Sequence, residues 1–234
     1  MDANTYVDIF STKGIEYLIV ISFFLLFIPF LRMVREIQRP VFSLADLRLP
    51  KGVYFNPTHM WGFLEANGKM AVGADDFLAN ITGPMNIRYL KKPGDEICQG
   101  EVISILENGD RTLNLYAPAS GVISRKNNPM RRHFGQSTDP DFTNNWLYKI
   151  TPMNWDREKR NLLMGSEAKT WISNELGRLR DFLTFADHKY SGNLQPILLQ
   201  EGGQIKDQVL TELSPEVWQE FQVEFLDAAK IEDV

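Results

Sequence analysis

Residues 106–121 read LENGDRTLNLYAPASG, and this stretch decides the fold of the chain. Asn108-Gly109 favours a tight hairpin turn, because both residue types tolerate positive φ. Leucine or alanine then occupies every second position from 113 to 117, which is the period of a strand with two different faces. Pro118 ends that strand, and Gly121 offers a flexible corner. The pattern predicts a β-hairpin and a second turn in a small β domain.

The segment after this hairpin, residues 116–123 (YAPASGVI), resembles the one that follows the lipoate-bearing lysine of lipoyl domains. The resemblance is strongest to the glycine cleavage system H protein. In that family the lysine lies six residues before the tyrosine, at the hairpin tip, and carries lipoate through an amide bond. This chain has Asp110 at that position, and a carboxylate cannot form the amide. The resemblance therefore implies the scaffold of a lipoyl carrier, and we expect no cofactor on it.

Other short motifs resemble the H protein in the same order along the chain. They are His59-Met60-Trp61, Val72-Gly73 with Asp76-Phe77-Leu78, Pro93-Gly94-Asp95 with Gly100-Glu101, Asp139-Pro140-Asp141-Phe142, and Trp146-Leu147-Tyr148. Many short strands separated by glycine and proline are typical of small barrels and sandwiches. We therefore expect a mainly β fold, a hybrid lipoyl-type barrel-sandwich, over residues 51–152.

Residues 14–31 read GIEYLIVISFFLLFIPFL, with Glu16 as the only charge. As a helix this segment would extend roughly 27 Å, close to the hydrocarbon thickness of a bilayer. A buried core helix would show more polar positions at helical spacing. A cleaved signal peptide would have positive charge before the apolar run and small residues after it, whereas Asp2 and Asp8 come first here. The sequence favours a membrane anchor in contact with the lipid bilayer.

Basic residues indicate the orientation of this anchor. Five follow the span and only Lys13 lies just before it; the five are Arg32, Arg35, Arg39, Arg48 and Lys51. The positive-inside rule then places the bulk of the chain in the cytoplasm, on a bacterial or archaeal cytoplasmic membrane. We expect the anchor in residues 1–35, a juxtamembrane linker in 36–50, the β domain in 51–152 and a helical extension in 153–234.

The extension contains two helical patterns. Apolar residues recur at helical spacing between Ile172 and Ala186, and Ser214-Pro215-Glu216 is a good helix start. The second helix carries Trp218 and Phe225 on its apolar stripe. Together the two helices carry more large apolar residues than the outer face of a small barrel requires, so we consider Trp218 and Phe225 as partner contacts, with core packing as the alternative.

Composition excludes several function classes. A net charge of −5 gives no electrostatic support to nucleic-acid binding. Cys98 is the only cysteine, so this chain cannot by itself hold an iron–sulfur cluster, and we expect the thiol to be buried on a strand. The three histidines are far apart in sequence and have no ligand spacing. No catalytic or phosphate-binding motif occurs. We expect neither a metal site nor an enzyme.

The remaining candidates are residues for contact with other protein subunits. They are Asn108, Asp110 and Arg111 at the hairpin tip, Arg131 and Arg132 in a basic segment, and Trp218 and Phe225 in the extension. We expect a non-catalytic, membrane-anchored accessory or scaffold subunit of a multi-subunit membrane complex, of the redox or respiratory oxidoreductase kind. The alternatives are a periplasmic adaptor of an efflux or secretion system and a working lipoyl carrier.

Overall fold

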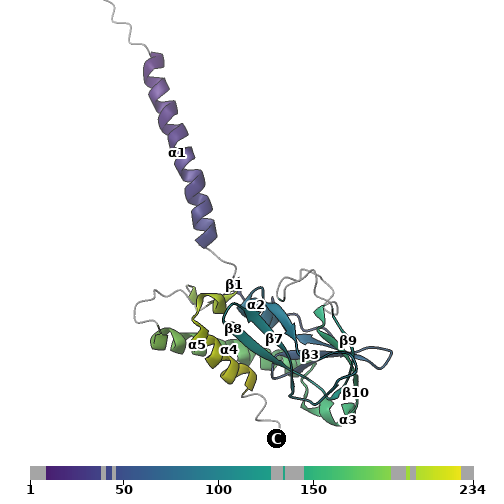
Figure 1. The fold of residues 1–234 in the computed structure, drawn as a ribbon. Coiled ribbons are helices and arrows are strands. Elements are labelled where there is room, and N and C mark those ends of the chain that lie inside the picture. The colour runs from purple at the N-terminus through teal and green to yellow at the C-terminus, as the bar shows by residue number, and fades with distance from the viewer. Residues whose placement is uncertain are drawn as a thin grey trace, which may run out of the picture. The chain divides into compact units, whose positions relative to one another are not determined.

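The computed structural model describes residues 9–37, 41–43, 46–127, 134, 145–190, 199–200 and 204–227. The chain divides into two compact units, Met1–Pro40 and Val41–Val234 (Figure 1).

The first unit contains one long helix, α1 (Ile9–Ile37). Its segment Gly14–Arg32 has a mean hydropathy of 2.3 and is not buried within the chain. By length and composition it is the one helix of the described residues that is able to cross a membrane. The helix begins before and ends after the predicted span, and Pro29 lies inside it rather than at its end.

The second unit is mainly β, as predicted. A six-stranded sheet has the order β2-β3-β4-β10-β9-β6, and two three-stranded sheets have the orders β5-β7-β8 and β1-β12-β11. The bounds are β1 Val41–Phe42, β2 Val53–Asn56, β3 Met60–Leu64, β4 Met70–Ala74, β5 Asn86–Tyr89, β6 Glu96–Ile97, β7 Val102–Asn108, β8 Arg111–Tyr116, β9 Gly121–Lys126, β10 Tyr148–Pro152, β11 Leu199–Gln200 and β12 Gln204–Lys206. Closure of the sheets into a barrel-sandwich stays a prediction.

The central hairpin joins β7 and β8, with its turn one residue later than predicted. Asn108 pairs with Arg111, so the two turn residues are Gly109 and Asp110. Gly109 has φ 65°. It occupies the first central position, where a type II′ turn requires positive φ. Asp110 therefore lies at the tip and is exposed to solvent, whereas Asn108 is the last residue of strand β7.

Gly121 has a different role from the predicted flexible corner. Its backbone is not among the positive-φ glycines of the described residues. A Cβ at this position would lie 2.3 Å from the carbonyl oxygen of Thr151. Gly121 is required because β9 and β10 approach each other closely where it pairs with Pro152.

The side chain of Cys98 also differs from its prediction. Cys98 is exposed rather than buried, because it follows β6 in a turn where its N–H donates to Glu101 Oε2 at 3.0 Å. Lys126 ends strand β9, and its Nζ is 5.2 Å from the centre of the Tyr89 ring.

Helices complete the second unit. They are α2 Asp76–Thr82, α3 Trp155–Glu158, the 3₁₀ turn η3 Lys159–Asn161, α4 Gly165–Tyr190, the 3₁₀ turn η4 Val209–Glu212, α5 Pro215–Phe221 and the π-helix η5 Gln222–Asp227. One hydrophobic core runs from the strands into α4, α5 and η5 without interruption. Figure 1 shows α5 beside strand β8. The C-terminal helices therefore form part of the folded domain.

Candidate functional site

The hairpin tip is the site that the sequence singled out. Asn108 and Asp110 are exposed there. Arg111 is half-buried: its Nη2 donates to the carbonyl oxygen of Leu213 at 2.9 Å, and its guanidinium lies 5.9 Å from the centre of the Trp218 ring. Arg111 thus fastens the hairpin to the C-terminal segment, which leaves Asn108 and Asp110 as the accessible polar side chains of the three.

Strand β8 lies at the edge of its sheet, and η5 covers that edge. The backbone N–H of Asn114 donates to Oε1 of Gln222 at 2.8 Å, so a side chain replaces the missing neighbour strand. Tyr116 donates from its hydroxyl to Asp227, and Gln222 Nε2 donates to the same carboxylate at 2.6 Å. Burial, and then the adjacent Asp227 carboxylate, raise the pKa of Tyr116.

Trp218 and Phe225 were predicted as partner contacts, and the structure corrects this prediction. Their exposed fractions are 1% and 2%, so no partner reaches them in this fold. Trp218 Nε1 donates to the carbonyl oxygen of Leu210 at 2.8 Å. Phe225 stacks on Phe221 with ring centres 4.6 Å apart. The aromatic stripe is buried because it packs against α4 and the sheet. Arg131 and Arg132 lie outside the described residues.

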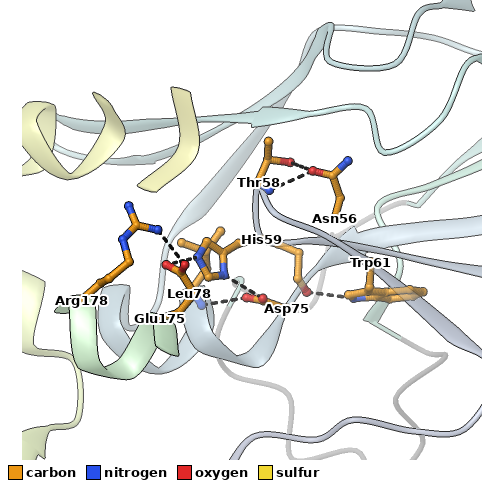
Figure 2. A network of polar contacts seen from close by, with 9 residues as sticks. Asn56, Thr58, His59, Trp61, Asp75, Leu78, Glu175 and Arg178 are labelled. Carbon is orange, nitrogen blue, oxygen red and sulfur yellow. Dashed lines mark hydrogen bonds and ion pairs between the residues drawn. The ribbon is translucent and has the colours of Figure 1, made fainter. Parts of the chain in front are cut away.

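A buried network of charged side chains forms a second candidate site, which sequence reasoning missed (Figure 2). His59, between β2 and β3, donates from Nδ1 to Oδ2 of Asp75 at 2.9 Å. On the other side of the ring, its Nε2 lies 3.8 Å from Oε2 of Glu175 in α4, an ion-pair distance longer than a hydrogen bond. Arg178 Nη1 then donates to Oε1 of Glu175 at 2.6 Å.

Several elements converge to build this network. Asp75 caps α2, since its Oδ1 accepts from the N–H of Leu78 at 3.0 Å. The ring of His59 is stacked on Phe77 with centres 4.3 Å apart. Arg178 also contacts η5, because its Nη2 donates to the carbonyl oxygen of Glu224 at 2.9 Å. The chain of contacts therefore connects the β-strand region with both C-terminal helical segments.

His59 is fully buried, and its two carboxylate neighbours favour the protonated ring. Burial is the largest single influence and lowers its pKa, but the carboxylates of Asp75 and Glu175 together outweigh burial and raise the pKa from 6.5 to about 9. For Glu175, burial raises the pKa, and the stronger combined effect of His59 and Arg178 lowers it. The protonated imidazole lies between two buried carboxylates, and Arg178, whose side chain is 48% exposed, supplies the second positive charge.

We expect a stability change with pH from this arrangement. The folded pKa of His59 is above its unfolded value of 6.5, so its contribution is complete below pH 6.5 and is lost as pH rises through about 9. The loss amounts to about 3 kcal/mol in the free energy of unfolding. The urea midpoint of the full chain in detergent, measured by pulse proteolysis between pH 6 and 10, tests this. An alkaline decline of equal size in a His59→Asn variant would contradict it.

The chemistry available to this network is limited by burial. Nε2 of His59 and Oε2 of Glu175 are buried, and neither has a hydrogen-bond partner among the described residues. In the described part of the chain, no group of three histidine, cysteine or carboxylate side chains is placed to hold a metal ion. We interpret the network as a charged clasp between the strands and α4.

A sequence signal for the clasp does exist. Glu175 lies three residues after Ile172 and four before Leu179, on the predicted apolar stripe of α4. A carboxylate on a buried stripe requires a cation nearby. Arg178, three residues later, and His59 both meet this carboxylate, although 116 positions separate His59 from Glu175 in sequence and no local pattern joins those two.

This chain is similar to several known proteins. Residues 53–175 match the family model described as glycine cleavage H-protein. A probable glycine cleavage system H protein of Thermococcus gammatolerans is 25% identical over 121 residues, covering 52% of this chain and 90% of that protein. The glycine cleavage system H protein of Ralstonia nicotianae is 29% identical over 107 residues, covering 46% and 84%.

A solved structure is also similar. The crystal structure of a glycine cleavage system H protein from Mycobacterium marinum has a TM-score of 0.42 and 23% identity, covering 54% of this chain and 98% of that one. The match of the family model, which extends over more than half of the sequence, shows that the chain belongs to the glycine cleavage H-protein family.

Proposed function

We propose that this chain is a non-catalytic, membrane-anchored docking subunit of a multi-subunit membrane complex, whose H-protein-like domain carries no lipoate. The supporting observation is the hairpin tip, where Asp110 is exposed at the position to which the family resemblance assigns the lysine. The residues of the tip do not fit a lipoyl group, because neither a carboxylate nor the engaged guanidinium of Arg111 offers the amine that the amide requires. A domain of this kind that lacks the lipoyl group keeps docking on other proteins as its role.

The support behind the tip suits this role. Arg111 is fixed by Leu213 and Trp218, and Gln222 bonds the backbone of β8 at Asn114. A hairpin held from one side loses little conformational freedom on binding, so less of the binding energy is spent on ordering it. Asp110 selects a partner that presents a cation or a hydrogen-bond donor.

Absence of lipoate is the first expected result. Intact-mass measurement of the chain purified from its own membranes should give the unmodified mass. The matched variant is Asp110→Lys, which restores an amine at the tip while leaving β7 and β8 unchanged. A lipoyl addition on any lysine of the wild-type chain would contradict the proposal and favour the carrier alternative.

Membrane anchoring is proposed from α1, whose segment Gly14–Arg32 has the length and composition of a span. We further propose that the second unit faces the cytoplasm, because Arg32, Arg35 and Arg39 follow the span. Carbonate washing should leave the chain in the membrane fraction, and protease added to intact spheroplasts should leave residues after the span uncut. Digestion without lysis would reverse the orientation and favour the periplasmic adaptor.

The complex we propose is a redox or respiratory oxidoreductase, since the resemblance implies a domain that docks on larger redox enzymes. Purification in mild detergent, followed by identification of the chains recovered in stoichiometric amounts, tests this role. Recovery of oxidoreductase subunits supports the proposal, and loss of those subunits in an Asp110→Lys variant places the contact at the tip. A wild-type chain that migrates alone in native gels would contradict the subunit role.

A further inference from the structure

Arg178 is the residue through which the buried clasp contacts the C-terminal segment. Its two terminal nitrogens donate in different directions, Nη1 to the carboxylate of Glu175 and Nη2 to the carbonyl oxygen of Glu224 in η5. The guanidinium also lies 4.8 Å from the centre of the Phe225 ring, which is 2% exposed. One side chain of α4 therefore contacts two successive residues of η5.

The π-helical form of η5 decides which of its side chains reach β8. Gln222 and Asp227 are five residues apart, which in an α-helix would place them about 140° apart around the axis. The hydrogen bonds of a π-helix join residues five apart, so here the two side chains lie on one face. From that face Gln222 accepts from the N–H of Asn114, and Asp227 accepts from the hydroxyl of Tyr116.

The local sequence does not require a π-helix. Residues 222–227 read QVEFLD, without glycine or proline, and this composition would equally continue α5 as an α-helix. Because π-helices are rare and short, contacts with the rest of the domain must hold η5 in this form. Arg178 provides such contacts from α4, and Asn114 provides one from β8.

We propose that Arg178 is a positioning residue for the docking hairpin, although it lies on α4. Arg178 holds η5 at Glu224, Gln222 of η5 holds β8, and β8 leads into the tip with Asp110. Without the contacts of Arg178, η5 relaxes toward an α-helix, Asp227 turns away from Gln222, and the edge of β8 loosens. This inference rests on the proposed docking role of the tip.

Arginine suits this position because its planar fork bonds Glu175 and Glu224 at the same time. Lysine would keep a positive charge beside Glu175, but its single ammonium group does not reproduce the two directions of the fork. Comparing Arg178→Lys with Arg178→Met therefore separates the bridge between α4 and η5 from the charge alone.

Hydrogen exchange of the full chain in detergent, measured at single amides, tests the first step. The amide of Asn114 should exchange about tenfold faster in Arg178→Met and about threefold faster in Arg178→Lys, as expected for a weakened local hydrogen bond. The amides of Leu113 and Leu115, which face β7, should keep their wild-type rates. The matched control is Arg180→Met, since Arg180 is exposed two residues further along α4.

Three results of this measurement would overturn the inference. An unchanged rate at Asn114 would mean that Arg178 does not hold the edge of β8. A wild-type rate in Arg178→Lys alone would assign the effect to charge rather than to the bridge. Equally faster exchange at Leu113 and Leu115 would show a general loss of stability instead of local positioning.

Recovery of other subunits in mild detergent tests the second step. Arg178→Met should lower this recovery about threefold, whereas Arg180→Met should leave it unchanged. Wild-type recovery by Arg178→Met, together with faster exchange at Asn114, would overturn the positioning role but leave the docking proposal intact. A wild-type chain recovered without any other subunit would overturn the docking proposal, and the role of Arg178 in docking with it.

Discussion

Replacing Trp218 by alanine should lower the free energy of unfolding by about 3–5 kcal/mol, the range for truncating a large aromatic side chain in a protein core. Trp218 is 1% exposed, and its indole N–H donates to Leu210. The variant loses the packing of the ring, leaves the carbonyl of Leu210 without this donor, and removes the ring beneath Arg111. Pulse proteolysis of the full chain in detergent, over a urea series, gives the change in midpoint.

The matched control lies in the same C-terminal segment. Val223 is 61% exposed in η5, so Val223→Ala should change stability by less than about 0.5 kcal/mol. Equal midpoints for Trp218→Ala and the wild type would mean that Trp218 does not belong to the core. In that case its earlier interpretation as a partner contact would return.

The His59→Asn variant should be destabilised by about 3–5 kcal/mol, because it leaves the carboxylates of Asp75 and Glu175 buried without their shared cation. His59 has φ 59°, and asparagine adopts this left-handed conformation more readily than most residues. The substitution therefore tests charge and packing with little added backbone strain. The same urea series at pH 6 measures it.

A second substitution shows whether the loss comes from the clasp. Glu175→Gln combined with His59→Asn should cost less than the sum of the single variants, since the partners of one ion pair are coupled. As a surface control, Asp156→Asn removes a carboxylate whose side chain is 93% exposed beside Lys159, and it should leave the midpoint unchanged. Additive losses at His59 and Glu175 would show that the two residues act independently.

Much of the fold follows from local sequence patterns. The hairpin, the cap of α2 at Asp75 and the start of α5 at Ser214-Pro215 each depend on neighbouring residues, and the structure contains all three. The turn was placed one residue early because Asn and Gly both favour turns, whereas the strand register decides which pair occupies the centre.

The burial of Trp218 and the position of His59 could not be predicted in the same way. An aromatic stripe on a helix has the same spacing whether it packs on its own domain or on a partner, and the surface available on β8 decides the outcome. The clasp depends on where α2 and α4 come together. Sequence spacing was therefore the wrong criterion for His59, and the carboxylate of Glu175 on an apolar stripe was the better indication.

The continuous core also has a consequence for biosynthesis. Asn114 and Gln222 are 108 positions apart, and Arg111 and Leu213 are 102 apart. Contacts between residues this far apart in sequence form late in folding, because closing the loop between them costs conformational entropy. On the ribosome, α1 emerges before the second unit, and the edge of β8 stays uncovered until Gln222 and Asp227 have been synthesised. The domain therefore completes its folding only after α1 has left the ribosome.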